Sequence, residues 1–202
     1  MDTSIRAQML AAYKENFCDL LRETGREHIE ELIRWLEETD FFTAPASAKT
    51  HGAYEGGLLI HSLSVYKILL NFSKNIPNVK KDSIILSALL HDLCKAGFYK
   101  TELRNRKNDH GEWEKVPVYA VDDQFPYGHG EKSVYLIERF LRLKTEEAMA
   151  VRWHMGGFDD SVRGGSFALA HAFEKYPLAV KLHLADLEAT YLREHGTSEV
   201  RN

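Results

Sequence analysis

Histidine and aspartate side chains recur along this sequence in an order that suits metal chemistry: His, His-Asp, His, His, Asp. The residues are His61, His91, Asp92, His129, His154 and Asp186. The His91-Asp92 pair follows directly on an apolar run over residues 83–90. A buried carboxylate without a partner is costly, so such groups are usually paired with cations or bound to metals. The series therefore predicts a site that holds two metal ions.

The six candidate ligands are all nitrogen or oxygen donors, and this restricts the metals that they suit. Such donors favour divalent first-row ions over a structural thiolate centre. We expect two divalent ions, with Mn or Fe favoured and Zn, Co, Ni or Mg as alternatives. Cys18 and Cys94 are too few for a disulfide framework or a thiolate zinc site.

Helices must carry most of these side chains, so the predicted fold class is all-α. Apolar residues recur at helical spacing over residues 4–24, 27–38, 58–75, 82–92, 130–143, 146–154, 167–175 and 178–195. Residues 42–57 contain Pro45 and several glycines, which predicts a loop. Between residues 99 and 126, strand-forming residues flank a turn-forming stretch at 108–111. This pattern predicts a small β-hairpin inserted into a helical bundle.

The spacing within these helices also turns the candidate ligands inward. His61 shares a helical face with Leu58 and Val65, and Asp186 aligns with Leu182. His154 follows an apolar face of its own helix. Helix bundles build metal sites in this way, from side chains on facing helices. We therefore expect separate helices to deliver these groups to one centre.

Composition excludes several classes of protein. The chain has 202 residues, 44% hydrophobic and 28% charged, with a formal net charge of -4. This balance argues against a general nucleic-acid coat or a protein of anionic membrane surfaces. Neither a signal stretch nor a membrane-length apolar segment is found, so we expect a soluble, cytoplasmic protein. We expect residues 1–50 to form an N-terminal helical extension packed on a single unit, residues 51–202.

The motifs around these residues resemble those of the HD superfamily of metal-dependent phosphohydrolases, from about His51 to Tyr191. The matching stretches are residues 56–62 (Gly-Gly-Leu-Leu-Ile-His-Ser), 90–95 (Leu-His-Asp-Leu-Cys-Lys), 128–131 (Gly-His-Gly-Glu) and 185–186 (Ala-Asp). The resemblance implies an HD-domain helical bundle and metal-binding roles for His61, His91, Asp92 and Asp186.

The resemblance also separates branches of the family. His129 and His154 match, in order and spacing, two extra histidines of the binuclear branch, which includes phosphodiesterases of cyclic nucleotides and dinucleotides. Asp92 would then bridge the two metals. Lys95 matches a family lysine that meets a substrate oxyanion, although it could instead neutralise a helix C-terminus. Residues 51–58 also look like the HD domain of certain bacterial 3′-to-5′ exoribonucleases, but a nucleic-acid-binding module has no counterpart here.

The function that follows is a metal-dependent phosphohydrolase or phosphodiesterase that acts on a nucleotide or another small phosphoester. The expected nucleophile is a hydroxide shared by the two ions, with Asp92 and Lys95 as the catalytic side chains. Three alternatives stay open: a di-iron oxygenase on the HD fold, a mononuclear HD nucleotidase and a non-catalytic ligand sensor. The expected partner is a small phosphorylated substrate. Neither a membrane nor stable nucleic-acid binding is expected, and a homo-oligomer is left open.

Several further residues allow both a functional and a structural interpretation. His183 either supports a metal ligand or is a satisfied core residue, and His51 either lines the pocket or stabilises its loop. Cys94 is expected to serve packing. The basic residues of the hairpin either cover a phosphorylated ligand or form a solvated surface. They are Lys100, Arg104, Arg106, Lys107 and Lys115.

Overall fold

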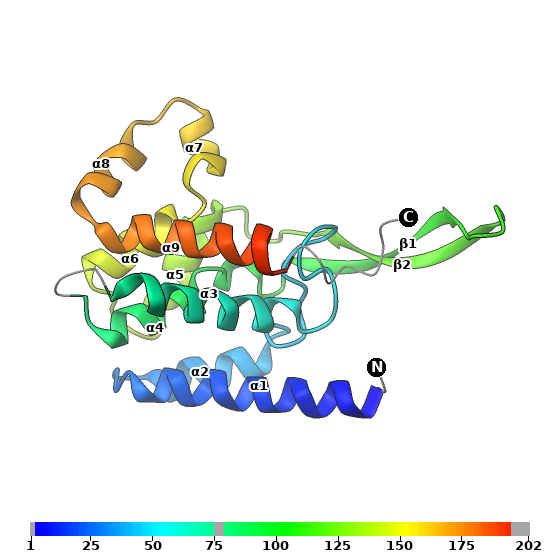
Figure 1. Ribbon diagram of the computed structural model, residues 1–202, viewed down its shortest axis with the longest axis horizontal. Helices are drawn as coiled ribbons and strands as arrows, with labels where there is room; N and C mark the ends of the chain where they lie inside the picture. Colours follow the sequence, from blue (N-terminus) through cyan, green and yellow to red (C-terminus); the bar gives the residue numbers. More distant parts are fainter. Residues whose placement is uncertain (1–2, 75–78, 195–202) are drawn as a thin grey trace.

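The computed structural model describes residues 3–74 and 79–194 of the chain, and it is helical apart from one hairpin (Figure 1). The helices are α1 Thr3–Glu23, α2 Ile29–Glu38, α3 Gly57–Ser73, α4 Lys81–Leu90, α5 His129–Glu138, α6 Thr145–Trp153, α7 Asp160–Arg163, α8 Ala168–Lys175 and α9 Pro177–Glu188. The strands are β1 Tyr99–Lys107 and β2 Trp113–Val121. The predicted all-α bundle with a small inserted hairpin is confirmed.

A bundle of α3, α4, α6 and α9 forms the centre of the molecule. Helix α3 packs on α4 and α9, while α6 packs on α4 and α9, and α5 covers α6. Their facing side chains, such as Leu59, Leu86, Val151 and Leu182, are fully buried. Each such apolar side chain stabilises the fold by about 1.5–3 kcal/mol when it leaves water. The bundle is therefore the rigid frame on which the candidate ligands sit.

Helices α1 and α2 lie along one side of this bundle (Figure 1). Helix α1 contacts α3 and α4. Phe17, Leu21 and Leu32 are fully buried in the same apolar cluster as the bundle residues. The N-terminal helices thus complete the core, while the domain division expected at residue 50 stays a prediction.

Polar contacts also tie the N-terminal helices to the bundle. Arg26, in the turn between α1 and α2, pairs with Asp82 at the start of α4 and with the buried Glu147 of α6. Lys144 donates to the same Asp82 carboxylate at 3.0 Å. Ser83 donates to Glu147 at 2.6 Å. Because Glu147 is fully buried, these partners are needed to offset the cost of removing its carboxylate from water.

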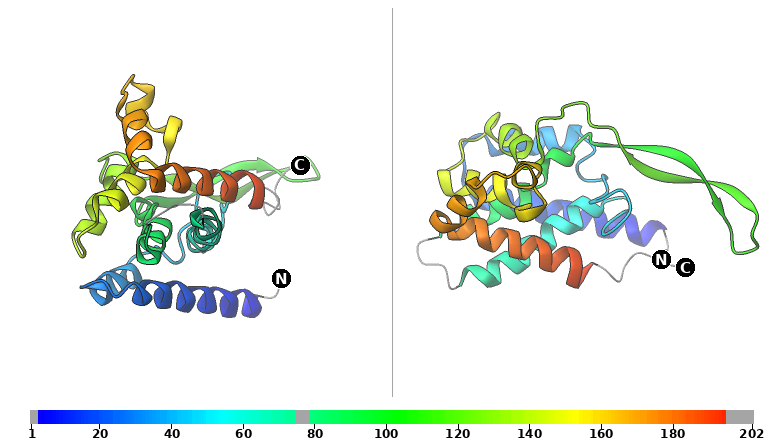
Figure 2. Two further views of the ribbon diagram at one scale, coloured as in Figure 1. Left: turned by 60° about the vertical axis from the view of Figure 1, so that its left-hand side comes forward. Right: turned by 90° about the horizontal axis from the view of Figure 1, so that it is seen from above.

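The hairpin extends away from the helices, as Figure 1 and the right-hand view of Figure 2 show. Its strands pair antiparallel, from Tyr99 opposite Val121 to Lys107 opposite Trp113. At the turn, the Asn108 side-chain oxygen accepts hydrogen bonds from two backbone N–H groups, and Gly111 adopts a φ of 79°. Asparagine suits such a turn because its side chain can accept backbone N–H groups, and glycine suits it because it adopts positive φ without steric cost. The predicted turn at 108–111 is confirmed.

Helix boundaries differ from the sequence-based expectation in a few places. Helix α5 ends at Glu138 rather than at residue 143; the chain then turns, with the Phe140 N–H donating to the Ile137 carbonyl at 2.9 Å and the Glu138 carboxylate accepting the Leu143 backbone N–H at 2.8 Å. Short helix α7 was not predicted; Asp159 caps it by accepting from the Ser161 N–H at 3.0 Å. The expected helix ends at residues 75 and 195 lie outside the described residues.

Pro177 occupies the first turn of α9, as expected. After Glu188 the helix widens into a π-helical turn, Ala189–Arg193. Among the described helices, none combines the length and apolar character that a membrane span needs.

Candidate functional site

The six candidate ligands predicted from the sequence come together inside the helical bundle. His61 lies within α3 and Asp186 within α9, while His129 is the first residue of α5. The His91-Asp92 pair directly follows α4, and His154 directly follows α6. Helix ends and helix interiors therefore supply the cluster from five separate elements.

Asp92 stands at the centre of this cluster, because its two carboxylate oxygens face different histidines. Oδ1 lies 2.7 Å from Nε2 of His129 and 3.4 Å from Nε2 of His154. Oδ2 lies 3.4 Å from Nε2 of His91 and 3.9 Å from Nε2 of His61. One carboxylate thus divides the four imidazoles into two pairs.

Asp186 joins the cluster from helix α9. Its Oδ1 lies 3.2 Å from Nε2 of His61. Four sets of three side chains, each with donor atoms within 4.8 Å of one another, could hold an ion. These sets are His51–His61–Glu194, His61–His91–Asp92, His91–His154–Asp186 and Asp92–His129–His154.

Among the residues that the structure describes, three imidazole nitrogens in the cluster are buried beside carboxylates without making a hydrogen bond. They are Nε2 of His61, His91 and His154, and these three side chains are at most 1% exposed. Buried polar atoms are almost always satisfied, so orphaned ones need an explanation. A lone pair directed at an ion gives that explanation, since neutral imidazole nitrogen is a common metal ligand. The residues present therefore fit divalent metal ions.

The other ring nitrogen is anchored in two of these histidines by the backbone. Nδ1 of His91 lies 2.8 Å from the carbonyl oxygen of Ala88, and Nδ1 of His154 lies 2.7 Å from that of Val151. A carbonyl only accepts, so each Nδ1 carries the proton and each Nε2 keeps its lone pair. This arrangement fixes the orientation in which both rings can bind a metal.

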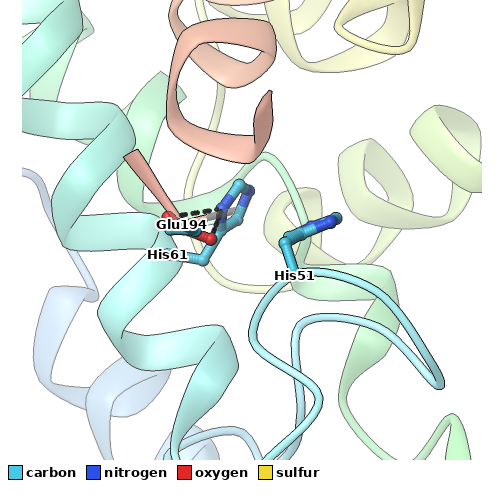
Figure 3. A group of neighbouring side chains, drawn as sticks. All are labelled: His51, His61 and Glu194. Atoms are coloured by element: carbon cyan, nitrogen blue, oxygen red, sulfur yellow. Dashed lines mark hydrogen bonds and ion pairs between the residues drawn. The ribbon is translucent and has the colours of Figure 1, made fainter. Parts of the chain in front are cut away.

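Nδ1 of His61 has a different partner, Glu194, which sequence reasoning missed. Figure 3 shows the Glu194 carboxylate against the His61 ring, with His51 beside them on the loop before α3. Both Glu194 oxygens lie 3.1 Å from Nδ1 of His61. The His51 and His61 ring centroids are 5.1 Å apart, so His51 lines the site. No local motif could have marked Glu194, because the π-helical turn that carries it is not visible in helical spacing.

Lys95 approaches Asp92 rather than open solvent. Its Nζ donates to Oδ2 of Asp92 at 2.6 Å and to the carbonyl oxygen of Ala46, also at 2.6 Å. The side chain is only 12% exposed. Burial lowers the pKa of this ammonium, but the Asp92 carboxylate more than compensates and raises it. Lys95 is thus held as a cation that links Asp92 to the loop before α3.

Electrostatics in the cluster follow from its mixture of carboxylates and imidazoles. Burial works against charge, yet Asp186 and Glu194 raise the pKa of His61 to about 10. The pKa of Asp92 is held well below its usual range despite burial, by Lys95 and His91 first. Burial, together with the neighbouring His91 and His129, lowers the pKa of His154 although Asp92 acts to raise it. The pKa of Asp186 is lowered as well, by His61 first, so the Asp92 and Asp186 carboxylates are ionised and suited to bind cations.

His183 and Cys94 each contact a candidate metal ligand. Nδ1 of His183 lies 2.6 Å from the backbone carbonyl of His154, so it supports the segment that carries a candidate ligand. The Sγ of Cys94 lies 3.5 Å from Nδ1 of His129, and the Cys94 backbone N–H donates to Ser133. Cys94 therefore packs against a candidate ligand rather than only against apolar residues.

A cavity of about 910 Å³ lies between α1, the loop before α3 and the hairpin. Four cationic side chains line it, namely Arg6, Lys49, Arg104 and Arg106, together with three tyrosines, Tyr13, Tyr54 and Tyr119. None of its lining residues is acidic. The loop that contributes Lys49 also carries His51, so one segment faces both the cavity and the ligand cluster.

Comparisons with known proteins agree with this geometry. The sequence profile of the HD domain matches residues 58–190. A dihydroneopterin 2′,3′-cyclic phosphate phosphodiesterase of Methanocaldococcus jannaschii is 46% identical over 84 residues, covering 39% of this chain and 31% of that protein. The 3′-5′ exoribonuclease YhaM of Shouchella clausii is 30% identical over 76 residues, covering 36% of this chain and 24% of that protein. Each match thus spans less than a third of the relative's length. No solved structure matches the chain.

Proposed function

Because the chain belongs to the HD domain family, we propose that it is a metal-dependent phosphohydrolase that cleaves a phosphodiester of a nucleotide or another small molecule. The observation that carries this proposal is the set of three buried Nε2 atoms, of His61, His91 and His154, which have no hydrogen bond among the described residues and lie 3.2–3.9 Å from oxygens of Asp92 and Asp186. One of the relatives named above is a phosphodiesterase by name and the other a 3′-5′ exoribonuclease, and the cleavage of phosphodiester bonds supports the same reaction class.

We further propose that two divalent ions bind, as in the binuclear branch. His61, His91 and Asp186 would hold one ion, and His129 and His154 the other. Asp92 would bridge them, since its Oδ2 faces His61 and His91 while its Oδ1 faces His129 and His154. A mononuclear site would leave either the Oδ1 or the Oδ2 group of histidines without a role.

Bound divalent ions would supply a nucleophile at neutral pH and stabilise charge on the phosphoryl oxygens. The side chains of this protein have their own tasks. Lys95 holds Asp92 in place through Oδ2 and adds positive charge beside it, which would favour an anionic transition state. The partly exposed His129, at 27%, marks the side from which a substrate reaches the cluster.

The cavity beside the loop supports a substrate that carries both an aromatic base and phosphate. Lys49 and Arg106 make no ion pair within the described residues, whereas Arg104 pairs with Glu102 and Arg6 bonds to the Glu55 carbonyl. Unpaired cations attract phosphate oxygens, and tyrosine rings offer surfaces on which a base can stack. A nucleotide meets both requirements.

Metal analysis combined with hydrolysis assays tests the proposal. Protein reconstituted with Mn, Fe or Zn should contain two ions per chain and cleave bis(p-nitrophenyl) phosphate or a 2′,3′-cyclic nucleotide. His129→Ala should lose one ion and most of the activity, while His171→Ala, an exposed histidine of α8, should retain both.

Other outcomes would contradict specific parts of the proposal. One ion per chain, unchanged in His129→Ala, would point to a mononuclear nucleotidase. Oxygen consumption by the reduced-iron protein without phosphoester cleavage would point to an oxygenase. Absence of metal after reconstitution would contradict the enzymatic function, and nucleotide binding without metal would then favour a ligand sensor.

A further inference from the structure

The three deeply buried histidines of the cluster are anchored in two different ways. His91 and His154 each direct Nδ1 at the backbone carbonyl three residues earlier, Ala88 and Val151. His61 instead directs Nδ1 at the Glu194 carboxylate, 133 residues away in sequence. The orientation of the His61 ring therefore depends on a distant side chain, whereas the rings of His91 and His154 are oriented by the backbone of their own helices.

The position of each histidine in its helix explains this difference. Ala88 and Val151 belong to the last four residues of α4 and α6, whose carbonyls lack intrahelical partners. His61 is the fifth residue of the long helix α3, Gly57–Ser73, and so lies inside the helix rather than after its last turn. The carbonyl three residues before it, that of Leu58, already accepts from the Ser62 hydroxyl at 2.9 Å and lies within the helical hydrogen-bond ladder. His61 must therefore find an acceptor elsewhere.

The π-helical turn after α9 brings that acceptor to His61. The Glu194 backbone N–H donates to the carbonyl of Ala189 at 3.0 Å, which is the five-residue hydrogen bond of a π-helix. A wider turn rotates less per residue than an α-helix. Glu194 thereby comes round to the side of the helix that carries Asp186. One element then contacts both ring nitrogens of His61, with Asp186 at Nε2 and Glu194 at Nδ1.

The contact between Glu194 and His61 is buried, so each side chain provides the other with a polar partner. Glu194 is 7% exposed and His61 is 1% exposed. A carboxylate removed from water needs a hydrogen-bond donor or a cation as partner, and the His61 ring provides it. Carboxylate partners of metal-ligating histidines fix the ring and increase its basicity, and their loss typically reduces metal affinity 10–100-fold.

We propose that Glu194 is a positioning residue for His61: it accepts the Nδ1–H and so holds the Nε2 lone pair toward the metal cluster. The π-helical turn is the structural device that places it there. This inference rests on the proposed metal-binding function, because it assigns Glu194 to the ligand that His61 would supply. Within α9 and its extension, Glu194 differs in this respect from Glu188, whose carboxylate pairs with Arg193.

The test compares Glu194→Gln and Glu194→Ala with the control Glu188→Gln. Metal affinity is measured by competition of Mn or Zn with a chelator, and the His61 Nδ1–H is followed by NMR in the Zn-loaded protein. Glu194→Ala should weaken binding 10–100-fold and shift or remove the Nδ1–H resonance. Glu194→Gln keeps an acceptor oxygen and should recover part of the affinity. Glu188→Gln should match the wild type in both measurements.

The wild-type protein separates failure of this inference from failure of the proposed function. If wild type binds no metal, the proposed function fails and this inference fails with it. If wild type binds metal and both Glu194 variants bind it equally well, with the Nδ1–H resonance unchanged, only the role of Glu194 is overturned. Should Glu194→Ala not fold, as circular dichroism would reveal, the Glu194→Gln resonance and affinity alone decide.

Discussion

Oδ1 of Asp92 lies 2.7 Å from Nε2 of His129, although the two residues are 37 positions apart in sequence, with the whole hairpin between them. Asp92 precedes β1 and His129 follows β2, so this contact joins the two ends of the segment that contains the hairpin. It also places the carboxylate that follows α4 against the first residue of α5. The hairpin can therefore extend outward while the chain on either side of it converges on the candidate site.

Replacement of Asp92 by asparagine should affect both proposed ions at once. The amide is isosteric but uncharged, and only one of its two positions accepts. We expect Asp92→Asn to lose bound metal and at least about 100-fold in phosphodiester hydrolysis. Asp109→Asn, at the tip of the hairpin, is the matched control and should keep both. Metal content by elemental analysis decides, and two retained ions in Asp92→Asn would remove the bridging role.

Substitution of Gly156 should disturb the candidate metal site indirectly, by displacing a side chain that supports one of the ligands. Its φ is 53°, and an added Cβ would lie 2.4 Å from the His183 ring. His183 supports the His154 carbonyl, so Gly156→Ala should destabilise the fold by about 1–3 kcal/mol and weaken metal binding. The neighbouring Gly157 has open space around its Cα. Gly157→Ala should therefore be nearly neutral in thermal unfolding and in metal titration, and equal effects of both variants would contradict this account.

Asp82 should make the stability of the fold depend on pH in the acid range. Burial opposes its ionisation, but Lys144 and Arg26 hold its pKa below the usual value. The carboxylate therefore stabilises the fold above the unfolded-state pKa of about 3.9, and this contribution is lost as the pH falls through the lower folded-state pKa.

Urea unfolding across the acid range measures this contribution. Asp82→Asn should lower the free energy of unfolding near neutral pH by about 1 kcal/mol, with a smaller difference from wild type at pH 3. Asp109→Asn again serves as the control. A difference between wild type and Asp82→Asn that stays constant from pH 7 to pH 3 would contradict the prediction.

Charge reversal in the cavity should change substrate binding more than chemistry. Lys49 and Arg106 line it, whereas Lys115 is exposed on the same hairpin but is not part of the lining. The double variant Lys49→Glu with Arg106→Glu should raise the KM for a nucleotide substrate about tenfold, with little change in kcat. Lys115→Glu should leave both constants near wild type.

Salt provides an independent check on the cavity. Attraction between exposed cations and phosphate weakens as ionic strength rises. Wild-type KM should therefore increase with salt, while the double variant should respond less. Identical KM values and salt responses in the two proteins would show that substrate does not use this cavity.

The sequence was sufficient to locate the long helices and the six histidine and aspartate side chains that the bundle brings together. Apolar periodicity located α3, α4, α6 and α9, and it turned His61 and Asp186 inward, because burial of one face dictates which residues meet. Turn chemistry at Asn108 and Gly111 located the hairpin. These features are local, so neighbouring residues suffice to determine them.

Glu194, the anchoring of Lys95 and the cavity depended on tertiary structure. Glu194 reaches His61 through a π-helical turn, and Lys95 reaches Ala46 across 49 residues. Cavity walls come from α1, a loop and the hairpin, which only folding brings together. Residue type and spacing thus determined which groups are available for chemistry. The three-dimensional packing decided which atom of each group is free, because hydrogen-bond partners come from distant parts of the chain.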